Sequence, residues 1–460
     1  MSERPITIAI VAGESSGDRQ GAALLEALRS QTAPRRVEAW GIGGKLMVAA
    51  GVKLHYNSEP WSSIGIAATL LNIPYLLSVR ANIKRALQAN PPDALVLIDS
   101  GGFNVEIGRW VKKRGVCPVF YYFPPGSWRK NTRPISPKRP LNKLAEATDR
   151  IVTPFPWSAD YLNSGGADAH FVGHPLLDLV KPQMTDQEFY ERFGLDPVRP
   201  IVALLPGSRV FELTHILPPL IGAAGEISRR IPGVQFVLAL APSAPRAYVE
   251  EMIRREQRQG GRAARLQLFM HQAGDKLAQI AHSTLPTPSP QMATTEGLTL
   301  PAPSEEEAHP LRERTIPNQA PLVITEDLTY DVMSRSDLVI TKSGTSTLEA
   351  AILHKPMIIV YRVSSLMAME YRLRKPSLRV THIGMPNIMA EEALFPELLQ
   401  DDATPEKISE LAVGILLQPE RLMSMKNRVT ELVHRVLGEP GGVDRSAKLL
   451  LDLIETHPRR

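Results

Sequence analysis

The chain has 460 residues, of which 43% are hydrophobic and 22% charged, and a formal net charge of +5. This composition places it among globular proteins, and the length predicts two domains. No run of residues reaches the roughly 18 to 20 apolar residues of a membrane span, the apolar run 6–12 is expected to be a strand rather than a signal peptide, and the single cysteine, Cys117, favours a reducing compartment.

Short runs rich in Val, Ile and Leu alternate with helix-like segments along nearly the whole chain. The alternation predicts two doubly wound parallel sheets of the α/β class. The domains are expected at 1–180 and 181–420, with C-terminal helices at 421–460 that pack across the domains or on a partner chain. The expected strands are 6–12, 94–98, 116–122, 150–154 and 171–172 in the first half, and 201–205, 234–240, 338–340 and 357–361 in the second.

The segment 283–321 is rich in Pro, Thr, Ser and Glu and has no periodic pattern. Such a composition cannot bury enough apolar surface to offset the entropy of ordering the chain. We therefore expect a disordered or loosely attached loop inserted in the second domain. A regulatory docking role is the alternative.

A polar turn follows the first strand. Its two glycines permit a tight turn, and the free N–H groups at the start of the next helix would suit an anion or a sugar hydroxyl. A plain strand-to-helix turn capped by Asp18 fits the same residues. The turn is not the G-x-G-x-x-G fingerprint, which disfavours a dehydrogenase. The candidate residues are Gly13, Glu14, Ser15, Ser16, Gly17 and Asp18.

A single carboxylate, Asp99, stands at the exit of the apolar strand 94–98. Parallel α/β sheets bind ligands at the carboxyl ends of their strands. A carboxylate placed there could serve as general base for a sugar hydroxyl. The alternative is a carboxylate that caps the next helix or pairs with a local amide.

The second half repeats the strand-then-glycine pattern at Leu204-Leu205-Pro206-Gly207-Ser208-Arg209. Arg209 beside a loop of free N–H groups would hold a diphosphate by charge-assisted hydrogen bonds. A surface arginine is the alternative.

The segment 337–351 is expected to form a strand, a hydroxyl-rich turn and a helix. This order directs a helix N-terminus at the sheet edge, where an anion is stabilised by the helix dipole and unpaired amides. Glu349 would reach ribose hydroxyls. Ordinary helix capping by Ser and Thr is the alternative.

Taken together, these segments resemble the lipid-A-disaccharide synthases over nearly all of the chain apart from the insert. The matching segments are AGESSGD at 12–18, GIGG at 41–44, IGI at 64–66, the Asp99 strand, FVGHPLLD at 171–178, LLPGSR at 204–209, SGTSTLEAAI at 343–352, VYRVS at 360–364 and MPN at 385–387.

The resemblance implies a GT-B fold, in which two Rossmann-like domains face a central cleft. It implies an inverting glycosyltransferase of lipid A biosynthesis that uses neither metal nor cofactor. The enzyme would move diacylglucosamine from UDP to the 6-hydroxyl of diacylglucosamine 1-phosphate. Asp99 becomes the candidate base, the turn at 13–18 lines the acceptor side, and the UDP contacts are Ser208, Arg209, Ser343, Gly344, Thr345, Glu349 and Asn387.

The apolar stretch 64–76 precedes the basic residues Arg80, Lys84 and Arg85. Such a pattern lets a protein dip into a membrane surface, whereas core packing of the same segment is the alternative. With the resemblance, we expect a cytoplasmic protein on the inner membrane, without nucleic-acid partners, and the family suggests a homodimer. The expected membrane contacts are Ile64, Ile66, Leu70 and Leu71.

Two segments depart from the family pattern, both on the acceptor side. Ser100-Gly101-Gly102 stands where relatives usually have a second aspartate and a proline, and 123–130 reads FPPGSWRK. The rival hypotheses are a related GT-B enzyme that uses a UDP-sugar with another acceptor, and a non-catalytic homologue that binds nucleotide or lipid.

Overall fold

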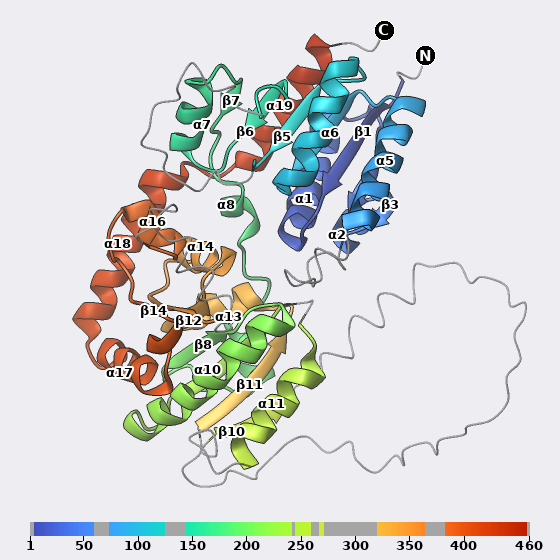
Figure 1. Ribbon diagram of the computed structural model, residues 1–460. Coiled ribbons are helices and arrows are strands. Elements are labelled where there is room, and N and C mark those ends of the chain that lie inside the picture. Colours follow the sequence, from blue (N-terminus) through green and yellow to red (C-terminus); the bar gives the residue numbers. More distant parts are fainter. Residues whose placement is uncertain are drawn as a thin grey trace, which may run out of the picture.

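The computed structural model describes residues 4–58, 73–124, 144–241, 244–258, 266–270, 320–363 and 382–457. These residues form two lobes, each built around a parallel seven-stranded sheet (Figure 1). The strand orders are β3-β2-β1-β4-β5-β6-β7 and β10-β11-β9-β8-β12-β13-β14. The predicted α/β class with two parallel sheets is therefore confirmed.

The first sheet comes from the N-terminal part of the chain. The predicted strands β1 and β4 have the expected bounds, but β7 lies two residues before the expected 171–172, because Ala169 and His170 pair with β6. Strands β2 and β3 were not expected, because glycines and charged residues interrupt their apolar runs. The strands are β1 Ile6–Ala12, β2 Val37–Gly43, β3 Val52–Asn57, β4 Ala94–Ile98, β5 Val119–Tyr122, β6 Arg150–Val152 and β7 Ala169–His170, and the helices are α1 Ser15–Thr32, α2 Lys45–Ala49, α5 Ile73–Ala89, α6 Gly101–Arg114 and α7 Pro156–Asn163.

The second sheet follows a linking segment that contains α8 (Leu176–Leu179) and α9 (Asp186–Phe193). Helix α9 begins with a capping box, in which Thr185 and Glu188 satisfy each other's backbone N–H groups. The strands are β8 Ile201–Leu205, β9 Gln235–Leu240, β10 Leu266–Met270, β11 Ala320–Glu326, β12 Leu338–Lys342, β13 Met357–Tyr361 and β14 Glu397–Leu399, and the helices are α10 Val210–Arg230, α11 Arg246–Arg258, α13 Thr329–Arg335, α14 Thr345–Ile352, α16 Met385–Ala390, α17 Pro405–Leu416, α18 Pro419–Leu437 and α19 Gly442–Thr456.

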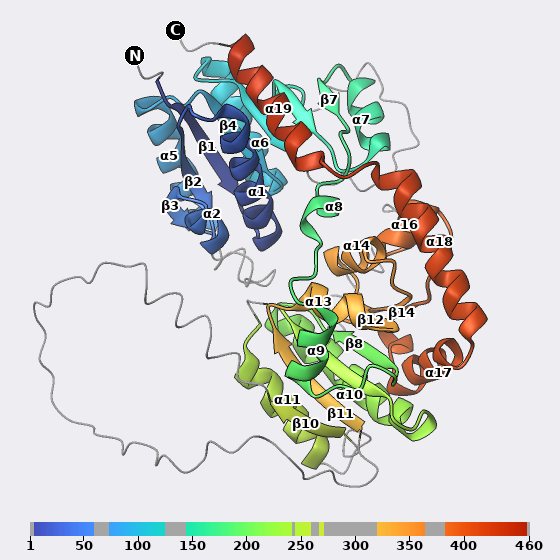
Figure 2. The ribbon, with the colours of Figure 1, turned by 180° about the vertical axis from the view of Figure 1, so that it is seen from behind.

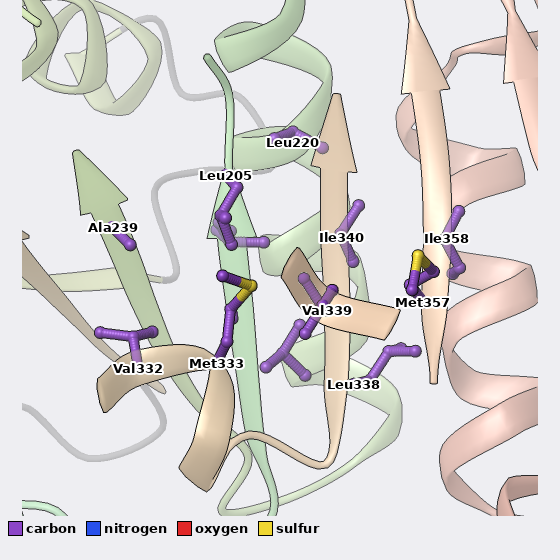
Figure 3. Close-up of a cluster of buried hydrophobic side chains, with 14 of the residues drawn as sticks. Leu205, Leu220, Ala239, Val332, Met333, Leu338, Val339, Ile340, Met357 and Ile358 are labelled. Atoms are coloured by element: carbon purple, nitrogen blue, oxygen red, sulfur yellow. The ribbon is translucent and has the colours of Figure 1, made fainter. Parts of the chain in front are cut away.

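Both faces of the second sheet are covered, so its central strands are continuous apolar runs. All five residues of β8 are buried. Figure 3 shows Leu205 of β8, Ile340 of β12 and Ile358 of β13 beside Met333 of α13 and Leu220 of α10. Each fully buried side chain of this kind contributes about 1.5 to 3 kcal/mol relative to exposure. This core fixes the strand ends that carry the polar loops.

The C-terminal chain returns to the first lobe. Helix α18 runs beside the second lobe, and α19 lies along the first (Figure 2), where Val443, Leu450 and Leu453 join the core under α1. The Asp178 carboxylate of α8 accepts the backbone N–H groups of Gly441 (2.5 Å) and Val443 (2.9 Å). The two lobes are thus linked both by the α8 segment and by the start of α19. Within the described ranges, no helix is long and apolar enough to cross a membrane.

Candidate active site

Asp99 and Ser100 form a strained turn directly after β4. Their φ angles are 49° and 47°, in the left-handed region that non-glycine residues rarely adopt. Each such residue costs on the order of 1 to 3 kcal/mol and persists only where its surroundings enforce it. The Asp99–Ser100 turn is therefore held by its neighbours rather than by local preference.

The buried side-chain amide of Asn104 holds the Asp99–Ser100 turn in place. Asn104 of α6 is fully buried, and its Nδ2 lies 2.9 Å from the carbonyl oxygen of Ile98, 3.0 Å from that of Asp99 and 3.3 Å from that of Val11. Tyr121 Oη donates a second hydrogen bond to the Asp99 carbonyl at 2.6 Å. One side chain thus joins the ends of β1 and β4 and fixes the backbone from which Asp99 projects.

Gly13, directly after β1, packs against the side chain of Ser100 in the same turn. A Cβ at this position would lie 1.9 Å from Ser100 Oγ and 3.0 Å from Ser100 Cβ. Real Cβ atoms essentially never lie this close to another atom, so a side chain at this position would force the Ser100 hydroxyl to rotate and the Ser100 Cβ to shift slightly. The glycine of the polar turn therefore makes room for the Asp99–Ser100 turn.

The remaining residues of the turn at 13–18 have different tasks. Asp18 is buried, and its carboxylate accepts the N–H groups of Gly44 (2.7 Å), Leu46 (3.0 Å) and Met47 (3.1 Å). It therefore caps the start of α2, and its expected part on the acceptor side stays a prediction. At Gly17 a Cβ would meet side chains of β1 and β4 at 3.3 Å. Ser16 is half-buried, and the side chain of Ser15 lies outside the described part of the structure.

The environment of Asp99 raises its pKa to about 6 from an ordinary value of 3.8. Burial is the largest cause, the negative charge of Glu14 adds to it, and a hydrogen bond from the Ser100 backbone opposes both. A carboxyl with this pKa is mostly ionised at neutral pH, yet it is a stronger base than an exposed aspartate. These are the properties of a general base that removes a proton from an alcohol.

Arg209 of the second lobe faces Glu14 of the first. Its Nη2 lies 3.8 Å from Glu14 Oε2, and both side chains are partly exposed. Glu14 follows β1 and Arg209 follows β8, so the carboxyl ends of the two sheets face each other. Because the negative charge of Glu14 also acts on Asp99, the guanidinium and the candidate base are both close to this one carboxylate.

The loop before Arg209 is organised by a residue that sequence reasoning missed. Glu212 of α10 is buried, and its Oε2 accepts the N–H groups of Ser208 (2.9 Å) and Arg209 (3.3 Å). The expectation of free N–H groups in this loop is therefore wrong. Lys342 Nζ, at the end of β12, donates to Glu212 Oε1 at 2.7 Å, and the pKa of Glu212 is lowered by this cation and these hydrogen bonds against the effect of burial. Glu212 thus reaches back to the N–H groups before its own helix, as the glutamate of a capping box does, whereas the Arg209 side chain has no acceptor for the reciprocal bond.

The hydroxyl-rich turn before α14 is tied to the start of α16. Ser343 Oγ donates to the Ile383 carbonyl at 2.8 Å, and Thr347 Oγ1 accepts the Met385 N–H at 3.1 Å. Thr345, the first residue of α14, is exposed, with Gly344 directly before it. The hydroxyls on either side thus fix the turn, while the N-terminus of the helix stays accessible to an anion.

Glu349 of α14 lies between the two lobes. Its Oε1 accepts a hydrogen bond from Tyr330 Oη at 2.9 Å and lies 3.9 Å from Arg19 Nη1. Burial raises the pKa of this carboxyl, whereas Tyr330 and Arg19 oppose the increase. Neither partner was identified in the sequence, because Arg19 lies just beyond the recognised segment 12–18 and α13 carries no recognisable motif.

Asn387 differs from its expected role as a nucleotide contact. Its side chain is fully buried, with Nδ2 donating to the Phe395 carbonyl and to Glu397 Oε1, each at 2.8 Å. Its Oδ1 accepts the Phe395 N–H at 2.8 Å. The amide thus connects α16 to the segment before β14 and helps to place the loop beside Ser343.

Some expected residues lie outside the described part of the chain. They include the membrane contacts Ile64, Ile66, Leu70 and Leu71, the insert 283–321 except Ala320 and Pro321, which begin β11, and all of 123–130 except Phe123 and Pro124. Over the described ranges, no group of three or more His, Cys, Asp or Glu side chains could hold a metal ion.

Comparison with known proteins agrees with this arrangement. The family model described as lipid-A-disaccharide synthetase matches residues 8–272 and 297–441. A lipid-A-disaccharide synthase of Geobacter metallireducens is 33% identical over 448 residues, which cover 97% of each chain.

Solved structures share the fold at low sequence identity. A calicheamicin glycosyltransferase has a TM-score of 0.55 at 15% identity, covering 99% of each chain. The UDP-GlcNAc 2-epimerase of Neisseria meningitidis, bound to UDP-GlcNAc, has a TM-score of 0.54 at 13% identity, covering 98% of this chain and 100% of that one. Both support the GT-B architecture. The match of the family model along most of the sequence and the full-length relative show that this chain belongs to the lipid-A-disaccharide synthase family.

Proposed function

We propose that this chain condenses UDP-2,3-diacylglucosamine with 2,3-diacylglucosamine 1-phosphate to form the β-1→6 disaccharide 1-phosphate and UDP. Family membership supports the reaction class and the substrates. The observation that carries the proposal is that Arg209 of the second lobe lies 3.8 Å from Glu14 of the first, whose negative charge acts on Asp99. A cation of the second lobe and a base of the first are thus both close to Glu14, and we place the meeting of the two sugars beside them.

In the proposed mechanism, the Asp99 carboxylate accepts the proton of the acceptor 6-hydroxyl. The acceptor oxygen forms a bond to the anomeric carbon of the donor from the face opposite the diphosphate. The bond from the anomeric carbon to the diphosphate oxygen breaks, and UDP leaves with the electron pair. The attack from the opposite face inverts the anomeric configuration, and Asp99 holds the proton.

The second lobe would stabilise the leaving diphosphate. Arg209 supplies a positive charge, and the turn Ser343, Gly344 and Thr345 offers the N-terminus of α14. Ser208 follows Gly207 in the loop ordered by Glu212. Glu349 would accept hydrogen bonds from the ribose hydroxyls. Fixed dipoles and charges of this kind stabilise charge that develops in the transition state without reorganising at the moment of reaction.

The membrane side is proposed for the segment around α5. Two large apolar side chains near the start of this helix are exposed, Tyr75 at 47% and Leu77 at 48%. Arg80, Lys84 and Arg85 follow on the same helix. Exposed apolar residues beside basic ones suit the surface of an anionic membrane, from which an acylated sugar would have to be taken. Association with the inner membrane and a homodimer both stay predictions.

The purified chain should be incubated with UDP-2,3-diacylglucosamine and 2,3-diacylglucosamine 1-phosphate, and the products identified by mass spectrometry. We expect the disaccharide 1-phosphate and UDP in equal amounts. Release of UDP from unacylated UDP-N-acetylglucosamine, without disaccharide from the acylated pair, would contradict the proposal.

A further inference from the structure

Arg19 reaches from the first lobe to the second. It lies on α1, one turn after Glu14, and its guanidinium donates to Tyr330 Oη. The guanidinium carbon lies 5.4 Å from the centroid of the Tyr330 ring, and Nη1 lies 3.9 Å from Glu349 Oε1. The cation therefore contacts the hydroxyl, the ring face and the carboxylate of the other lobe.

Tyr330 connects this cation to Glu349. Its hydroxyl accepts from Arg19 and donates to Glu349 Oε1 at 2.9 Å, so the three side chains form one hydrogen-bonded chain across the lobes. A hydroxyl that accepts from a cation becomes a better donor, because hydrogen bonds in series polarise one another. Burial and the nearby Glu349 carboxylate raise the pKa of the Tyr330 hydroxyl, so it keeps the proton that it donates to Glu349.

The contacts with Arg19 and Tyr330 counteract the effect of burial on the Glu349 carboxylate. The Glu349 side chain is only 14% exposed, and burial disfavours its ionised form. Arg19 and Tyr330 are the groups that favour the carboxylate. A neutral carboxyl would lose acceptor capacity for hydroxyl groups. A residue of the first lobe therefore influences both the charge and the direction of a carboxylate in the second.

We propose that Arg19 is a positioning residue of the nucleotide site, which acts through Tyr330 to hold Glu349 as an oriented acceptor for the ribose hydroxyls when the lobes are together. This inference rests on the proposed function, because it assigns the ribose to Glu349. It adds a contribution of the acceptor-side lobe to the binding of the donor, and so couples UDP binding to the approach of the two lobes.

The test measures UDP affinity by calorimetry without any acylated substrate, together with donor KM and kcat. Arg19→Gln should weaken UDP binding roughly tenfold, the size expected for loss of one hydrogen bond to a charged group, and should raise donor KM more than it lowers kcat. Tyr330→Phe should weaken binding similarly. The double variant should be little worse than either single one, because both remove the same connection. Arg19→Lys, which keeps the charge, should recover part of the affinity.

Arg36→Gln is the matched control, because it removes the same charge from an exposed position before β2, at the amino edge of the same sheet. It should leave UDP affinity unchanged. Unchanged affinity in Arg19→Gln, a loss confined to kcat, or fully additive losses in the double variant would overturn the assignment while leaving the proposed function intact. Failure of the wild-type chain to bind UDP would overturn both.

Discussion

We expect Glu14→Gln to change the pH dependence of kcat/KM for the transfer reaction. The acid limb of this profile, where the rate falls at low pH, should move to lower pH. Asp99 can accept a proton only when it is ionised, and its pKa is raised to about 6. With that value, about nine-tenths of the molecules carry the base form at pH 7 but only about one-tenth at pH 5, so kcat/KM should fall roughly tenfold over this interval in the wild type. Removal of the Glu14 charge takes away the second-largest cause of the raised pKa, and the fall should be smaller.

The assay is kcat/KM for the donor between about pH 4.5 and pH 9, with disaccharide measured by mass spectrometry. The plateau value of kcat/KM is expected to change as well, because Glu14 also lies 3.8 Å from Arg209. The quantity to compare is therefore the pH at which the acid limb lies, not the height of the plateau. The limb should stay above the range of an ordinary aspartate, since burial is the larger cause. Glu26→Gln, an exposed position on the same helix α1, controls for the loss of one negative charge. A limb that stays in place or moves to higher pH in Glu14→Gln would refute the reasoning.

Three further substitutions test how the site is held. Asn104→Leu removes the donor to three carbonyl groups and should cost about 2 to 3 kcal/mol of unfolding free energy and lower kcat more than UDP affinity, as measured by urea unfolding and calorimetry. Gly13→Ala should lower kcat by displacing Ser100, and Ser100→Gly added to it should restore part of the rate; no recovery would exclude the clash as the cause. Lys342→Met should destabilise the fold by about 2 to 3 kcal/mol at pH 7, somewhat less than for a fully buried pair because two backbone N–H groups still bind Glu212. The folded-state pKa of Glu212 is lowered, so the stabilisation is fully present above its ordinary value of 4.5 and should be lost as pH falls from that value through the folded-state pKa; an equal loss at pH 7 and pH 3 would contradict the role of the pair.

The sequence was informative where a strand is an uninterrupted apolar run. Strands β1, β4, β8 and β13 have the predicted bounds, because burial on both faces makes nearly every residue apolar. It was uninformative where glycine and charged residues interrupt the run, as in β2, which reads VEAWGIG. Asp99, Arg209 and Glu349 could be selected for the same reason, because polar residues that follow buried strands stand out.

The parts of the site that depend on contacts between distant segments could not be predicted. The hydrogen bonds from Arg19 to Tyr330 and from Tyr330 to Glu349 together connect Arg19 to residues more than 300 positions away, and no local sequence pattern marks them. Sequence order also could not show that Glu212 accepts the N–H groups of the 207–209 loop that were assigned to a phosphate. Nor could it show that the side-chain amide of Asn387 donates to Phe395 and Glu397. Such competition between ligand and protein for the same polar groups is decided by tertiary packing.

The most direct test of the account is the pair of measurements on Asp99→Asn: UDP affinity and the rate of disaccharide formation. The amide keeps the shape of the side chain but cannot accept the proton of the acceptor hydroxyl. The account predicts UDP affinity within about twofold of the wild type and a kcat at least about a hundredfold lower, the usual contribution of a general base. A variant that binds UDP normally and forms disaccharide at a near-normal rate would contradict the assignment of Asp99 as the base.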